Sequence, residues 1–126
     1  MLAILGVVAS RFEGVELSFL IVPMLLSGVL FDVAFTLIRR ALAGERLTEP
    51  HRGHLYQVAQ RSGVPAPIVA LVHWAFAAFG GLCALVFLAA PSSAKPFVPL
   101  LTLLPQLLWL GFVLVRARRA GLTRWG

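Results

Sequence analysis

The sequence predicts an all-α integral membrane protein, a helical bundle with three full transmembrane helices and a truncated N-terminal half-span. The first observation is the composition, which is 60% hydrophobic and only 13% charged, with a mean hydropathy of +0.91. A soluble domain of 126 residues needs more polar surface than this. The second is that long apolar runs, of the length that crosses a bilayer, alternate with short polar segments. We therefore expect one membrane domain over residues 1–126.

The positive charge of the chain is also consistent with a membrane protein. The formal net charge is +6 and the sequence pI is near 11.4, which is also typical of nucleic-acid-binding proteins. Such proteins gather basic side chains on one water-exposed face, whereas here the basic residues flank the apolar runs. We expect no nucleic-acid partner. The single cysteine, Cys83, lies inside an apolar run and supports no disulfide framework.

The first element, residues 1–10, is apolar but short. A helix of this length spans about 15 Å, roughly half of the hydrocarbon core. It lacks the positively charged start of a signal peptide. We interpret it as the end of a helix whose beginning is missing, followed by a polar turn around Gly14.

The full spans are predicted at residues 17–38, 66–90 and 97–115. Pro23 is expected to kink the first span, because proline removes one backbone hydrogen bond. Arg39 and Arg40 end that span at a membrane interface. The prolines of Val64-Pro65-Ala66-Pro67 are typical of the first turn of a helix and mark the start of the second span.

The polar segment between the first two full spans, residues 39–65, is expected to form a loop with a short amphipathic helix. Gly44 and Pro50 interrupt any continuation of the preceding helix. Leu55, Val58 and Ala59 then recur at helical spacing, which is typical of a helix that lies on a membrane surface.

The basic residues predict the orientation of the chain. The 39–65 loop contains five of them: Arg39, Arg40, Arg46, Arg52 and Arg61. The tail, residues 116–126, contains four: Arg116, Arg118, Arg119 and Arg124. Arg11 and Lys95 are on the other side of the membrane in this arrangement. Because positively charged loops stay on the cytosolic side, we expect the loop and the C-terminus in the cytosol.

Asp32 is the most informative single residue, because a carboxylate within a span is costly and faces a bundle interior or a polar cavity. Thr36 at i+4 and Arg39 at i+7 continue the same helix face, so the three residues form one polar stripe that leads to the cytosol. A structural role, paired with a neighbouring helix, and a functional role remain about equally consistent with this pattern.

The histidines are the other candidates for chemistry. His51, Arg52 and His54, in the sequence HRGH, suit an anionic ligand such as phosphate. A solvated basic loop in contact with lipid headgroups explains them as well and is the simpler interpretation. A zinc site is disfavoured, because structural zinc takes four ligands. His73 is more typical of a histidine that is hydrogen-bonded to a neighbouring helix than of a catalytic one.

The run DVAFTLIRRALAGERLTEPHRGHLYQVAQRSGVP resembles one membrane enzyme family. These are the polyprenyl-phosphate N-acetylhexosamine-1-phosphate transferases (the MraY/WecA-like group, glycosyltransferase family 4). The matching features are Asp32 in a span, Arg39-Arg40 at its end, the HRGH histidines, and Arg61-Ser62-Gly63 before the next span. The HRGHLYQ form is most similar to the branch that starts lipopolysaccharide O-antigen synthesis.

The resemblance implies the transfer of a sugar-1-phosphate from a UDP-sugar to undecaprenyl phosphate, with Mg²⁺, at the cytosolic face of the bacterial inner membrane. It implies that His51, Arg52 and His54 bind the nucleotide or diphosphate, and that Asp32 and Arg39 support the site. The sugar is left open.

The sequence departs from this family in one respect. The adjacent aspartates and the other catalytic aspartate motifs of the family are absent, and the resemblance covers only the final third of a typical member. We therefore expect the chain to be inactive alone and the Mg²⁺ ligands to lie outside it, on a missing N-terminal portion; a homo-oligomer is a further possible assembly. Two alternatives are a non-catalytic small membrane interaction protein and a transporter subunit that uses Asp32 and His73 as a proton relay.

Overall fold

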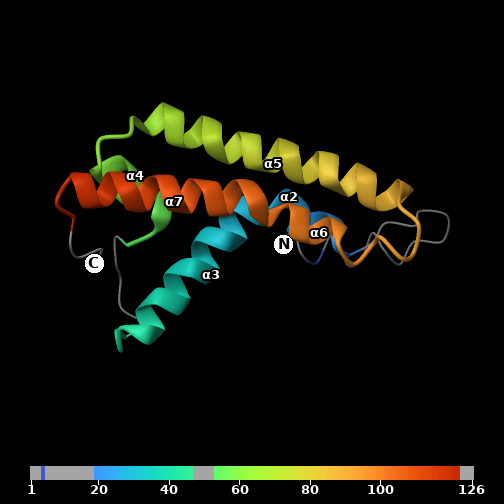
Figure 1. Ribbon diagram of the computed structural model, residues 1–126, viewed down its shortest axis with the longest axis horizontal. Coiled ribbons are helices and arrows are strands. Elements are labelled where there is room, and N and C mark those ends of the chain that lie inside the picture. The colour runs from blue at the N-terminus through green and yellow to red at the C-terminus, as the bar shows by residue number, and fades with distance from the viewer. Residues whose placement is uncertain (1–3, 5–18, 47–52, 123–126) are drawn as a thin grey trace.

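The computed structural model describes residue 4 and residues 19–46 and 53–122 (Figure 1). Most of the expected half-span, together with His51, Arg52 and the last four residues, lies outside these ranges. The regular secondary structure within them is all helical, without β-strands. The helices are α2 (Ile21–Leu25), α3 (Ser27–Leu42), α4 (Leu55–Arg61), α5 (Ala66–Ala89), α6 (Val98–Leu101) and α7 (Leu103–Arg119).

Two stretches of the described residues are long and apolar enough to cross a membrane, Ala66–Ala89 and Val98–Arg119. Only 28% of the most apolar window of each is buried inside the protein, whereas the core helix of a soluble protein is mostly buried. The outward-facing side chains are large and apolar, among them Trp74 and Leu108, which are 76% and 77% exposed. Surfaces of this kind suit contact with lipid rather than water.

The stretch expected as one span over residues 17–38 is divided into two helices. Leu26, between α2 and α3, has φ −91° and ψ 9°, away from helical values. Hydrogen bonds nevertheless cross this junction: the Leu26 N–H donates to the Val22 carbonyl, and the Leu30 N–H donates to the Leu26 carbonyl. The bend follows Pro23, which has no N–H to donate. Neither α2 nor α3 is one of the two candidate spans, and α3 continues beyond the expected end, to Leu42.

The arrangement places α4 at one end of the bundle, where α5 begins and α7 ends (Figure 1). The short helix packs on α7, α5 and α3. Its buried face, formed by Leu55, Val58 and Ala59, shares a hydrophobic cluster with Val69 of α5 and Val113 of α7. In Figure 1, α3 diverges from the long helices toward its C-terminal end.

A second hydrophobic cluster lies farther along α5. Met24 of α2, Cys83 and Phe87 of α5, and Val98 of α6 belong to it. Here α2 and α5 approach closely, because Gly80 has no side chain: a Cβ atom at this position would lie 2.0 Å from the Met24 carbonyl oxygen. Small residues permit such close backbone approach between membrane helices.

Candidate functional site

Asp32 is buried, at 5% exposure, and its carboxylate joins α3 to the start of α4. The N–H groups of Leu55 and Tyr56, the first two residues of α4, donate to its oxygens over 2.8 and 3.1 Å. The Thr36 hydroxyl donates to Oδ1 over 3.1 Å, and Nδ1 of His54 lies 3.3 Å from the same oxygen. The carboxylate therefore takes the place of an N-cap side chain, although it belongs to a different helix.

This cap explains how a seven-residue helix is held in place, since helices of this length are not stable alone. His54 precedes α4 with an extended backbone, and its N–H donates weakly to the Gln57 side chain over 3.4 Å. At the other end of α4, the Arg116 guanidinium of α7 donates to the Ser62 carbonyl over 3.2 Å. Both ends of α4 are thus fixed by side chains of other helices.

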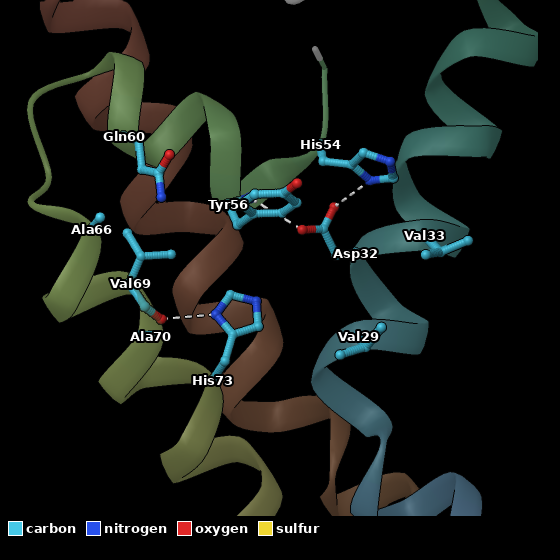
Figure 2. A pocket seen from close by; sticks show the side chains of 10 residues that line it. All are labelled: Val29, Asp32, Val33, His54, Tyr56, Gln60, Ala66, Val69, Ala70 and His73. Atoms are coloured by element: carbon cyan, nitrogen blue, oxygen red, sulfur yellow. Dashed lines mark hydrogen bonds and ion pairs between the residues drawn. The ribbon is translucent and has the colours of Figure 1, made fainter. Parts of the chain in front are cut away.

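A cavity of about 490 Å³ lies between α3, α4 and α5, and Figure 2 shows its lining. Its polar residues are Asp32, His54, Tyr56, Gln60 and His73, and its apolar residues are Val29, Val33, Ala66, Val69 and Ala70. This combination of apolar walls and a few convergent polar groups is typical of a small-molecule site.

Aromatic rings follow one another along this cavity. The rings of His54 and Tyr56 are stacked with centroids 5.8 Å apart, and Tyr56 meets His73 edge to face at 6.4 Å. Nδ1 of His73 lies 2.9 Å from the Val69 carbonyl oxygen. A carbonyl only accepts hydrogen bonds, so Nδ1 carries the proton. Figure 2 shows the other ring nitrogen on the side that faces α3.

The candidate residues from the sequence are only partly brought together. Asp32 and His54 are in direct contact and line the same cavity. Arg39 does not line it; together with Arg40 it pairs with Glu45, over 3.4 and 3.0 Å. His51 and Arg52 are outside the described residues.

Sequence reasoning missed Tyr56, Gln60 and His73 as cavity residues. A signal for His73 was present: Ala66, Val69, Ala70 and His73 have the spacing i, i+3, i+4, i+7 of one helix face. The smaller residues of this stripe leave room for a cavity beside His73.

The Mg²⁺ implied by the family resemblance does not fit the described residues. Among these, no three side chains of His, Cys, Asp or Glu are grouped so that they would hold a metal ion. The Asp32 carboxylate, the single acidic group among the described lining residues, already accepts hydrogen bonds from two backbone N–H groups and from Thr36. A magnesium site needs several oxygen ligands in octahedral geometry.

Comparison with known proteins returns no similar family, protein or structure. The chain matches no protein-family model, no curated protein and no solved structure.

Proposed function

We propose that this chain forms the C-terminal part of the cytosolic site of a membrane transferase, which moves a sugar-1-phosphate from a UDP-sugar of the N-acetylhexosamine type to undecaprenyl phosphate. In this proposal the reaction serves the synthesis of cell-envelope polysaccharide at the bacterial inner membrane. The observation that carries it is the position of His54, which stands at the junction of the basic loop with the cavity between α3 and α5. Contact with the buried Asp32 carboxylate fixes its place there.

The proposed roles follow from this geometry and from the motif. His54, with His51 and Arg52 from the preceding loop, binds the diphosphate through charge-assisted hydrogen bonds. Asp32 is a positioning residue, because its oxygens hold the first turn of α4 rather than the substrate. Arg39 belongs to the ion pair with Glu45 and steadies the end of α3. The metal-binding carboxylates come from another polypeptide segment.

The proposed topology adds one crossing to the two apolar stretches. The bent pair α2 and α3 crosses the membrane as a third span, since hydrogen bonds continue through its junction. The 39–65 loop and the C-terminus face the cytosol in this arrangement. The basic residues at the ends of α3 and α7, among them Arg40 and Arg118, then lie on that side.

The test is a transfer assay in vesicles that contain undecaprenyl phosphate, labelled UDP-N-acetylglucosamine and Mg²⁺. The chain is reconstituted with a polypeptide that carries the aspartate motifs of the resembling family. We expect lipid-linked product from the pair and none from the chain alone. His54→Ala is expected to reduce transfer by at least about tenfold, because one charge-assisted contact to the diphosphate is lost.

Ser93→Ala serves as the control, since this exposed turn residue lies at the opposite end of α5, and we expect it to leave transfer unchanged. Wild-type transfer by the His54→Ala pair would remove His54 from the site. Robust product from the chain alone would show that its own carboxylates suffice for the reaction.

A second function, that of a non-catalytic membrane interaction protein, is favoured by one observation. Asp32, the sole described carboxylate inside a helix of the bundle, is engaged in capping α4. In that case the reconstituted pair forms no product with any UDP-sugar, while the Asp32 contacts still stabilise the fold.

A further inference from the structure

The cavity between α3, α4 and α5 presents hydrogen-bond acceptors that the fold does not fully use. Oδ1 of Asp32 is near three polar groups, whereas Oδ2 accepts a single bond from the described residues, from the Tyr56 N–H. The two oxygens of a carboxylate together offer about four acceptor positions. Oδ2 therefore retains one position for a donor that enters the cavity.

His73 supplies a second acceptor. Because its Nδ1–H donates to the Val69 carbonyl, the tautomer that fits this contact has its lone pair on Nε2. Figure 2 shows this nitrogen on the side of the cavity that faces α3, the helix that carries Asp32. Acceptors on α3 and α5 thus face one space, with the Tyr56 ring beside them.

The apolar walls of the cavity indicate the chemistry of the remaining part of a ligand. Val29 and Val33 of α3 lie across the cavity from Val69 and Ala70 of α5, so its apolar lining is aliphatic (Figure 2). None of the described lining residues is an arginine or a lysine. An anionic head would bring a negative charge beside Asp32 without a permanent cation among these described lining residues to offset it.

We propose that this cavity binds an amphiphile with an alkyl tail and a hydrogen-bond-donating head that carries no negative charge, namely an alkyl amine or an alkyl alcohol. An ammonium head carries three N–H donors, so it bonds Asp32 Oδ2 and His73 Nε2 together and lies against the Tyr56 ring. The aliphatic walls bury the first part of the tail. His54 borders both this cavity and the proposed diphosphate contacts, but the inference rests on Asp32, Tyr56 and His73 and stands without the diphosphate.

The test is a titration of the purified full chain in detergent micelles with three probes that share one tail: decylamine, decanol and decyl phosphate. Imidazole ¹H–¹³C spectra report on His73. We expect a saturable shift of the His73 signal with decylamine, a weaker one with decanol, and binding of decyl phosphate at least about tenfold weaker than that of decylamine.

Two substitutions of α5 alanines separate the cavity from the lipid-facing surface. Ala70 lines the cavity, whereas Ala75 lies on the same helix outside it, and both are exposed in the described fold. Ala70→Phe fills the cavity and is expected to abolish the saturable shift; Ala75→Phe is expected to retain it. Val33→Phe closes the cavity from α3 and serves if Ala70→Phe does not fold.

Three results would overturn the proposal. The first is a decyl phosphate affinity equal to or above that of decylamine, which would assign the cavity to an anion. The second is the absence of any saturable shift with all three probes. The third is an equal response of Ala70→Phe and Ala75→Phe, whether the shift is kept or lost in both, which would show that the shift does not report on this cavity. All three are read from the chain alone, without any transfer activity.

Discussion

Two contact regions of the bundle, at its α4 end and where α2 crosses α5, are held together in different ways. At the α4 end, directional hydrogen bonds to one carboxylate, that of Asp32, fix the contact between α3 and α4. At the α2 crossing, Gly80 and Met24 come together through shape, with no polar side chain involved. The first contact fixes a short polar helix in one position, and the second brings two apolar helices close. A functional site is better served by the first kind, because it orients the groups beside it.

The largest loss of stability is expected where the Asp32 carboxylate of α3 caps α4. Asp32→Ala leaves the N–H groups of Leu55 and Tyr56 without their acceptor, and Leu55 is only 1% exposed. An unsatisfied buried donor costs roughly 1–3 kcal/mol, so the loss is about 3 kcal/mol for the pair. Hydrogen exchange is the measurement: the amides of α4 should lose protection while those of α5 keep it.

Thr36→Val is the matched control for Asp32→Ala. It removes one hydrogen bond to the same carboxylate and keeps the shape of the fully buried side chain. Its expected cost is about 1 kcal/mol. If both variants leave the exchange of the α4 amides at the wild-type rate, then Asp32 does not hold this helix.

A smaller loss of stability is expected where α2 crosses α5 at Gly80. Gly80→Ala places a Cβ atom against the Met24 carbonyl, so α2 must move away from α5. Overpacking of this kind costs roughly 1–3 kcal/mol. Denaturant titration in mixed micelles should show the loss. Gly111→Ala is the control, since nothing lies within 4 Å of its added Cβ, and helix propensity favours it by roughly 0.5–1 kcal/mol. Equal stability of the two variants would contradict the close crossing.

The smallest change in stability is expected for the buried hydrogen-bonded pair of Gln106 and Ser27. Nε2 of Gln106 donates to Ser27 Oγ over 2.9 Å, but Oε1 of the same fully buried amide has no partner among the described residues. Gln106→Leu loses one interhelical bond, worth about 0.6 kcal/mol on average in membrane proteins, and removes an unsatisfied acceptor. We expect a change within about 1 kcal/mol in the same titration. A loss as large as that of Gly80→Ala would show that this pair, rather than helix shape, holds α3 to α7.

The fold class and the second apolar helix were accessible from sequence because they depend on local composition. The prediction of an all-helical chain is confirmed for the described residues, and the helix expected at 66–90 is observed at Ala66–Ala89. The first span was expected as one helix over residues 17–38 with a kink at Pro23, and it is divided three residues after this proline, at Leu26. Hydropathy reports how apolar a segment is, but the position of a bend after Pro23 depends on the helices packed against it.

The candidate site depended on contacts that no local pattern encodes. The polar stripe of Asp32 and Thr36 was visible in the helical spacing, and their hydrogen bond is present. The spacing does not show which groups bond to Asp32. Its carboxylate accepts from the N–H groups of Leu55 and Tyr56, more than twenty residues away in the sequence. Arg39, on the same helix face by spacing, instead pairs with Glu45 after the turn at Gly44, where φ is +69°.

The dependence of α4 on three other helices has a consequence for the order in which the protein is assembled. The acceptor for its first turn comes from α3, and the side chains under its buried face come from α5 and α7. Since α7 is synthesised last of these, α4 can be completed only after the whole bundle has left the ribosome. A chain released before Arg116 would contain every polar residue of the cavity, but it would lack the guanidinium that holds the end of α4.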